Sequence, residues 1–313
     1  MSVIPAIVSR RVRRSSPGRL AAALALALVA SVPALSQHDP EIAEVYRRVT
    51  RQGSDYVVAD SAVVYSTMRA EEKIVVLPRG EPVHRLRQSH KWTRIRTRLG
   101  EVGYVRTTDL SDIWILVSKN RHMLYVYRGM ERIDEVPVDL AINFKGDKIR
   151  RGSYLNPEDW RTPEGLFYIT WKRSSSRFYK ALVLSYPGPS HAARGLEQNL
   201  ISRDGYARIV NANQMLENPP MNTLLGGWIE IHGHGIDGRA NWTQGCIALE
   251  NADIDRLWRY VSEGTSVYVS PYTRDRARTE PMLIAHLLPA GKRKPPVIKP
   301  AGSVYSTTLT SNE

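Results

Sequence analysis

Residues 228–249, WIEIHGHGIDGRANWTQGCIAL, constrain the fold most, because two short apolar segments flank a glycine-rich loop. The first segment alternates apolar and polar residues up to His232, which is typical of a strand that ends at a loop. Fourteen residues later stands Cys246, the single cysteine of the 313 residues, and the apolar residues 247–249 follow it. The pattern predicts two strands that bring an imidazole and a thiol together.

Cys246 has two interpretations, a reactive nucleophile or a small buried side chain. A free thiol has a pKa of about 8.5, so a nucleophilic cysteine needs a neighbouring base or cation. The preceding Gly245 allows a ligand to approach the backbone and leaves the amides of Gly245 and Cys246 to hold an oxyanion. A structural cysteine requires neither feature. We therefore interpret Cys246 as a nucleophile and His232 as its general base.

Three upstream runs accompany this stretch: RTPEGLF at 161–167, LSYP at 184–187 and LGG at 225–227. Together with the I-H-G step and the T-Q-G-C-I run, they resemble the L,D-transpeptidase catalytic domain (YkuD-type). The resemblance covers residues 112–270 and implies a β-sandwich-like domain with a few helices. It also implies attack by Cys246 on the diaminopimelate carbonyl of a peptidoglycan stem peptide, which leaves a thioester that an amine or water resolves.

The resemblance further implies roles for the neighbours of the two reactive groups. The backbone carbonyl of Gly233 orients His232, and the amide of Gly245 holds the oxyanion. Thr243 takes the Ser/Thr position of the motif and contacts substrate or braces the turn. His234 lies two residues beyond His232 and is the alternative base, or a substrate contact.

Two positions depart from the family pattern. Gln244 stands where most members have a second histidine, and Ala248 stands where many have arginine or asparagine. Arg239, in the loop, is the nearest cation in sequence that can contact a substrate carboxylate instead, or it is a solvated loop residue. A family branch with a similar G-C-[FI]-A run hydrolyses wall linkages. Transpeptidation is therefore the expected reaction, and hydrolysis by the same thiol stays open.

Two other classes of function compete with a thiol enzyme. His232, His234 and Cys246 form a conceivable zinc set. Beyond the His-x-His pair and the single cysteine, the sequence offers no further ligand motif, so we expect neither a metal nor a cofactor. A non-catalytic wall-binding protein is the second rival. The joint presence of His232, Gly245 and Cys246 argues against it.

The N-terminus has the pattern of an export signal. Residues 1–19 contain five arginines and no acid, residues 20–30 are apolar, and small residues follow near Ser36. We predict a signal peptide at 1–36 and a location in the periplasm or cell envelope. A retained anchor is the alternative. Export also makes an unpaired cysteine more notable, because exported proteins usually pair their cysteines.

Composition divides the rest of the chain. Residues 37–54 suit a short helix or linker, and 55–111 contain short β-rich runs separated by turns, as in a small barrel. These runs resemble a bacterial SH3-type domain, which implies either cell wall contact or a spacer. Residues 271–313 read as a basic, proline-containing disordered tail. The expected fold class is mainly β: a small SH3-like barrel followed by the sandwich-like catalytic domain.

The net charge of +13 does not indicate a nucleic-acid-binding protein. Much of the excess lies in the arginine-rich start and the basic tail, and no basic stripe interleaved with aromatic residues is present. A mildly basic body suits an anionic wall surface. The predicted partners are peptidoglycan stem peptides.

Overall fold

The computed structural model describes residues 40–238 and 240–273. The predicted signal peptide at 1–36, the loop cation Arg239 and nearly all of the predicted tail lie outside the described residues. None of the helices in the two described ranges has the length and apolarity needed to cross a membrane.

Residues 40–111 form a helix and a seven-stranded sheet. Helix α1 spans Pro40–Val49, and a 3-10 turn at Thr107–Asp109 precedes the last strand. The strands are β1 (Asp55–Val57), β2 (Ser61–Tyr65), β3 (Lys73–Pro78), β4 (Pro82–Gln88), β5 (Trp92–Arg96), β6 (Val102–Arg106) and β7 (Leu110–Ser111). Their order is β3-β2-β6-β5-β4-β1-β7, around a core that includes Val64, Val83 and Ile95.

This sheet is not closed into the small barrel that the sequence predicted. β3 and β7 are its two edges, and β2 meets β6 through a single residue pair, Tyr65 and Tyr104. β7 leads directly into the next sheet. The likeness to a bacterial SH3-type domain stays a prediction.

Residues 113–270 contain an eight-stranded sheet. Its strands are β8 (Ile113–Ser118), β9 (Met123–Arg128), β10 (Glu131–Pro137), β12 (Gly165–Ser176), β13 (Tyr179–Leu184), β14 (Glu230–His232), β16 (Ile247–Ala248) and β17 (Ser266–Ser270). Their order is β10-β9-β8-β17-β12-β13-β14-β16. A separate pair joins β11 (Leu140–Ala141) to β15 (Asn241–Thr243). The protein is therefore mainly β, as the sequence predicted.

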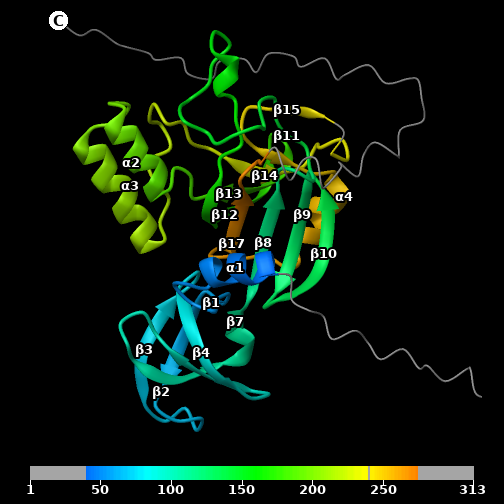
Figure 1. The fold of residues 1–313 in the computed structure, drawn as a ribbon. Helices are drawn as coiled ribbons and strands as arrows, with labels where there is room; N and C mark the ends of the chain where they lie inside the picture. Colours follow the sequence, from blue (N-terminus) through cyan, green and yellow to red (C-terminus); the bar gives the residue numbers. More distant parts are fainter. Residues whose placement is uncertain (1–39, 239, 274–313) are drawn as a thin grey trace, which may run out of the picture.

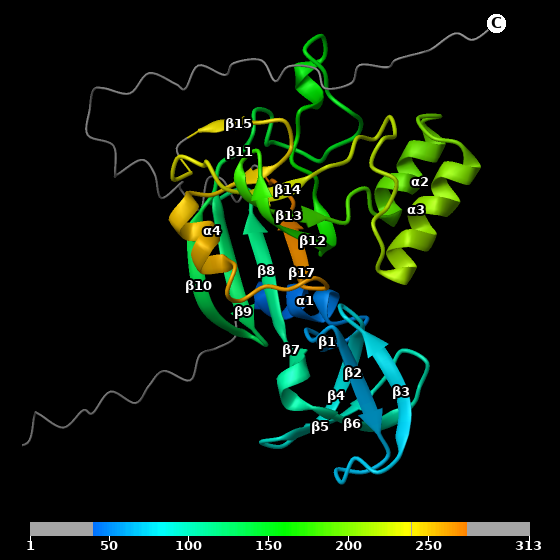
Figure 2. The same ribbon diagram turned by 180° about the vertical axis from the view of Figure 1, so that it is seen from behind.

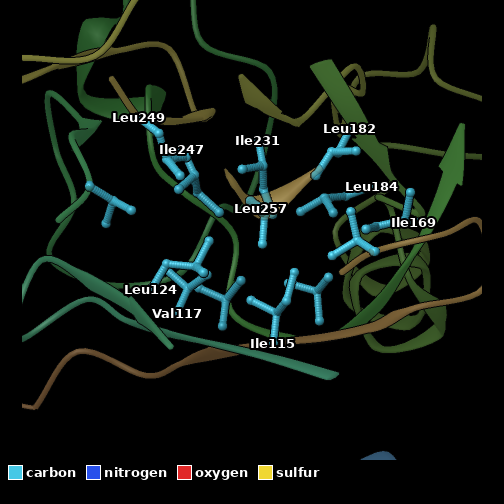
Figure 3. Packing of buried hydrophobic residues seen from close by; sticks show 14 of the residues in the cluster. Ile115, Val117, Leu124, Ile169, Leu182, Leu184, Ile231, Ile247, Leu249 and Leu257 are labelled. Atoms are coloured by element: carbon cyan, nitrogen blue, oxygen red, sulfur yellow. The ribbon is translucent and has the colours of Figure 1, made fainter. Parts of the chain in front are cut away.

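The main core lies on one face of this sheet, where apolar side chains from distant segments meet (Figure 3). Ile115, Leu182 and Ile231 come from β8, β13 and β14, and all three are fully buried. α4 (Asn251–Leu257) closes this core with Ile254 and Leu257. Ile231 of β14 and Ile247 of β16 point into this core. Successive residues of a strand point to opposite faces, so the neighbours of Ile231 and Ile247 point to the other face of the sheet.

Two further helices, α2 (Pro189–Glu197) and α3 (Arg203–Met215), pack against each other outside the sheet (Figure 1). The helical pattern predicted one region over 191–216. The chain breaks it into two because Asn199 takes a left-handed conformation and the side chain of Ser202 caps α3 through the amide of Gly205.

Helix α1 and the N-terminal sheet both contact the part of the chain that forms the eight-stranded sheet. Val45 and Val49 of α1 pack on Trp114, Tyr125 and other residues of the sheet's second face. The Tyr56 hydroxyl lies 2.7 Å from the Thr265 hydroxyl. The N-terminal sheet lies at the end of β8 remote from β14, β15 and α4 (Figures 1 and 2).

Candidate active site

His232 ends β14, in the middle of a row of paired strands. It pairs with Ala181 of β13 on one side and with Ala248 of β16 on the other. The two small neighbours leave room for the imidazole, which is 1% exposed. The predicted strand before His232 is thus present, although it is only three residues long.

The imidazole of His232 is held in one orientation. Its Nδ1 lies 2.7 Å from the backbone carbonyl of Gly233, so Nδ1 carries the proton and Nε2 keeps a free lone pair. Phe178 stacks on the ring at 4.4 Å, and Trp242 approaches it edge-on at 5.9 Å. Burial is the main cause that lowers the pKa of His232 to about 4, so the ring is neutral at neutral pH.

The turn before Cys246 depends on Gly245. Its φ of +142° is a conformation that other residues rarely adopt, and an added Cβ would lie 2.8 Å from Ile229 Cδ1. The Thr243 hydroxyl accepts a hydrogen bond from the Gly245 amide (3.3 Å) and donates one to the Cys246 carbonyl (2.6 Å). Thr243 therefore braces this turn.

The same hydrogen bond involves one of the two amides that the sequence predicts for an oxyanion. In this structure the Gly245 amide is buried and donates to Thr243. Oxyanion binding by the amides of Gly245 and Cys246 stays a prediction.

Cys246 lies on the same face of the sheet as His232. Ile247 pairs with Ile231, so Cys246 lies beside Glu230 and diagonally from His232 across parallel strands. The residue as a whole is partly exposed, and its thiol donates to the Trp228 carbonyl at 3.6 Å. Among the described residues, no hydrogen bond joins the thiol to His232.

The thiol is neutral in this state. Burial is the main cause that raises the pKa of Cys246 to about 12, and the carboxylate of Glu230 raises it further. A backbone hydrogen bond from Glu230 and the charge of Lys148 act in the opposite direction. The site therefore holds a neutral thiol and a neutral imidazole, not an ion pair.

Asp139 anchors the loop between the two reactive groups, and sequence reasoning missed it. Its fully buried carboxylate accepts hydrogen bonds from the Ile236 amide (2.6 Å), the Ala240 amide (3.3 Å) and the Trp242 indole (3.0 Å). Trp242 in turn contacts His232. The only sequence signal was an acid in an apolar run, V-D-L, which is common enough to pass unnoticed.

His234 lies at the rim of the site. It is exposed, adopts a φ of +63°, and its ring meets the edge of Phe178 at 6.5 Å. Its backbone amide donates to Asn251 Oδ1. No three histidine, cysteine or acidic residues within 40–238 and 240–273 lie close enough to hold one metal ion.

Residues 112–269 match the model of the YkuD family, the L,D-transpeptidase catalytic domain. The match spans half of the chain. The chain belongs to the L,D-transpeptidase (YkuD) family. In the comparison with curated proteins, no sequence matches significantly.

Among solved structures, the chain matches an L,D-transpeptidase from Mycobacterium tuberculosis, at 12% identity and a TM-score of 0.33. That alignment covers 74% of this chain and 85% of the other. Bd1075 from Bdellovibrio bacteriovorus is 16% identical, with a TM-score of 0.32, over 54% of this chain and 53% of that one. An L,D-transpeptidase from Xylanimonas cellulosilytica is 13% identical, with a TM-score of 0.30, over 51% and 60%. The chain thus spans little more than half the length of the last two proteins.

The L,D-transpeptidase domain has a pocket of about 210 Å³ beside Cys246. Its lining includes Lys148, Arg151, Trp228 and Gln244. Lys148 is 4% exposed, and burial is the main cause that lowers its pKa to about 8. Sequence reasoning missed both cations, because they belong to a polar segment that reads as an ordinary surface loop.

The family's frequent cation two residues after the cysteine has no counterpart here. Ala248 is 0% exposed and pairs directly with His232. Gln244 is exposed and borders the pocket.

Proposed function

We propose that the protein is a peptidoglycan L,D-transpeptidase that acts through a thioester on Cys246. The observation that carries this proposal is the fixed imidazole of His232. Its Nδ1 is held by the Gly233 carbonyl, and its free Nε2 lies on the same sheet face as the single thiol. This arrangement is what a neutral general base requires.

The reaction starts from the neutral pair. As the sulfur of Cys246 attacks the stem-peptide carbonyl, Nε2 of His232 accepts the thiol proton, and the amide of Cys246 donates to the oxyanion. The C–N bond then breaks, and His232 returns the proton to the departing amine. The acyl group remains on sulfur as a thioester.

The second half reverses these steps. The amine of an acceptor peptide attacks the thioester carbonyl, His232 removes its extra proton, and the thiolate leaves as the new amide forms. The proton on His232 then returns to Cys246. The amide bond broken in the donor is thus replaced by a new amide bond to the acceptor, and no outside reductant or oxidant is needed.

Hydrolysis is the second candidate, and the buried Ala248 favours it. A site without a cation at this position lacks a contact that many family members have on the substrate. Water then takes the place of the acceptor amine, and the product is a shortened stem peptide or a released wall-linked protein.

The location follows the substrate. The protein acts in the cell envelope, after export directed by residues 1–36. The SH3-like segment at 55–111 contacts the wall and keeps the catalytic domain near its substrate.

Incubation with tetrapeptide-bearing wall fragments tests the proposal. The intact protein should gain the mass of the acyl group, and Cys246→Ser should gain none. Cross-linked dimers among the products indicate transfer, whereas tripeptides alone indicate hydrolysis. A wild-type protein that gains no mass with any stem peptide, although Cys246 reacts with small alkylating reagents, would overturn the proposal.

A further inference from the structure

We propose that Lys148 and Arg151 form a carboxylate-binding subsite that holds the acyl donor beside Cys246. The ligand is a free carboxylate on the residue whose carbonyl is attacked. This inference rests on the proposed function for its substrate, but the anion site itself can be tested without turnover.

The two cations share one pocket with the thiol. Lys148, Arg151 and Cys246 all line the cavity of about 210 Å³, and none of the described residues that line it is acidic. A Cβ built on Gly245 would lie 3.7 Å from Lys148 Nζ, so the ammonium sits next to the residue that precedes the thiol. A substrate carboxylate bound here can therefore belong to the same residue as the carbonyl that Cys246 attacks.

Lys148 is buried with most of its hydrogen-bonding capacity unused. Its Nζ donates to the backbone carbonyl of Asp159 at 3.1 Å, and an ammonium has three protons to donate. Cys246, when it is ionised, and the Asp159 carboxylate both contribute a favourable charge at Lys148. The Asp159 carboxylate lies 4.0 Å from Arg150 instead of pairing with Lys148. Because a buried cation without an anionic partner is costly, a ligand anion completes this site.

Lys119 shows how this protein satisfies a buried lysine that has only a structural role. Its Nζ donates to Glu164 Oε1 (2.8 Å), the Gly146 carbonyl (2.6 Å) and the Thr162 carbonyl (3.0 Å). All three of its protons are used, one of them in an ion pair. Within the described residues, Lys148 has no ion pair with a carboxylate, so the structural role of Lys119 does not explain the burial of Lys148 beside Cys246.

Glycines keep the pocket open around Lys148. A Cβ on Gly226 would lie 3.2 Å from Lys148 Cε, and Gly226 has a φ of +91°. Its neighbour Gly227 has no room for a side chain, because a Cβ would lie 2.2 Å from the Met221 carbonyl oxygen. The backbone thus forms the wall, and a small planar group can reach the ammonium.

Arg151 is exposed at the mouth of the same pocket. Its amide donates to the Leu224 carbonyl at 2.7 Å, which fixes the backbone. No carboxylate within the described residues pairs with its guanidinium. The charge of Arg151 also contributes to the lowered pKa of Lys148. Two unpaired cations that repel each other across one pocket are the expected arrangement for an anion site.

The charge of alkylating reagents tests the site directly at Cys246. Iodoacetate and iodoacetamide both form an S–C bond and release iodide, but only iodoacetate carries a carboxylate. Both reagents react with the same thiolate, so a change in the thiolate fraction alters both rates equally. The ratio of the iodoacetate rate to the iodoacetamide rate therefore reports on anion recognition alone. We would measure it for the wild type, Lys148→Met and Arg151→Ala.

Arg150→Ala is the matched control. Arg150 is the adjacent loop arginine, its side chain is 53% exposed, and it does not line this pocket. We expect the ratio to fall on the order of tenfold in Lys148→Met, by less in Arg151→Ala, and to stay at the wild-type value in Arg150→Ala. Equal ratios in all four proteins would overturn the site. Arg151→Ala changes an exposed residue, so it decides the matter if Lys148→Met does not fold.

A second comparison identifies the donor. The wild type should form the acyl-enzyme faster with a stem peptide whose carboxylate is free than with the same peptide amidated there. In Lys148→Met this preference should fall on the order of tenfold. A wild type that acylates both peptides equally contradicts the donor assignment and leaves the proposed function intact. If no peptide acylates while the reagent ratio still depends on Lys148, the function fails and the anion site stands.

Discussion

At the residue scale, the pair formed by Cys246 and His232 differs from a thiolate–imidazolium pair. Burial raises the pKa of the thiol to about 12 and lowers that of the imidazole to about 4. Both shifts oppose charge separation, so the proton stays on sulfur until a substrate arrives. In the proposed mechanism, His232 therefore accepts the proton during attack and not before it.

The pH dependence of alkylation follows from this state. Because the thiol pKa lies far above neutrality, the thiolate fraction at Cys246 rises about tenfold for each pH unit between pH 5 and 8. The rate of iodoacetamide labelling should rise in parallel, without a plateau. Stopped-time mass spectrometry measures it, with a free small thiol as the reference. A flat rate across this range would reveal an ion pair and refute the neutral assignment.

Substitutions separate the two histidines. His232→Ala removes the base, and we expect acyl-enzyme formation to slow by about 10²–10⁴. His234→Ala removes an exposed ring at the rim and should cost less. Cys246→Ser should abolish turnover, because a hydroxyl is far less acidic than a thiol. Thermal unfolding of each variant provides the control for folding, and a larger loss in His234→Ala would exchange the two roles.

At the element scale, the turn between β15 and β16 decides where the thiol points. Thr243 closes the turn with two hydrogen bonds, and Gly245 supplies a conformation that only glycine adopts easily. The short strands on either side cannot hold the turn by themselves, since β16 contains two residues.

Gly245→Ala tests this turn. The added methyl group combines backbone strain of about 1 to 3 kcal/mol with a contact of 2.8 Å to Ile229. Gly165→Ala is the matched control, because Gly165 has a similar φ of +118° and nothing within 4 Å of an added Cβ. We expect Gly245→Ala to lower the midpoint of urea unfolding more and to suppress labelling of Cys246. Equal effects of the two variants would show that only strain matters.

The sequence predicted those parts of the site that depend on neighbouring residues in the chain. The strand before His232 and the glycine before Cys246 are local patterns, so both were identifiable. Lys148 and Asp139 were not, because each acts on residues roughly a hundred positions away that only the folded sheet brings near. A buried lysine and a surface lysine look alike in a polar segment.

The same distinction applies to the secondary structure. The strands of the catalytic domain were visible from their apolar runs, whereas the break between α2 and α3 depended on the positive φ of Asn199 and the Ser202 cap. The open sheet at 55–111 was taken for a barrel, because alternating strands indicate which face is buried but not whether the last strand meets the first.

At the scale of the whole molecule, two glycines lie at the contact between the N-terminal sheet and the catalytic domain. A Cβ on Gly264 would lie 2.4 Å from the Gly80 Cα, so the turn after β3 touches the catalytic domain backbone to backbone. Tyr56 and Thr265 add a hydrogen bond beside this contact. The N-terminal sheet is therefore docked at the end of the sheet opposite the site.

Gly264→Ala should loosen this docking. The methyl group must push Gly80 away, and Gly264 has a φ of +90°. Gly100→Ala is the control, because Gly100 has a φ of +97° and nothing within 4 Å. We expect Gly264→Ala to increase proteolytic cleavage near residues 107–112 and to lower the unfolding temperature more than the control does. Identical digestion patterns would mean that the glycine contact contributes nothing.

The isolation of Cys246 has a consequence for oxidative damage. These 313 residues offer no second thiol, so a sulfenic acid formed on Cys246 has no partner for an intrachain disulfide. Further oxidation to the sulfinic acid is irreversible, and a thiol from outside the chain must intercept the sulfenic acid first. The neutral thiol slows the initial step, because oxidants react with thiolates. Under the proposed mechanism, the suppressed ionisation that makes attack depend on His232 thus also slows the oxidation of Cys246.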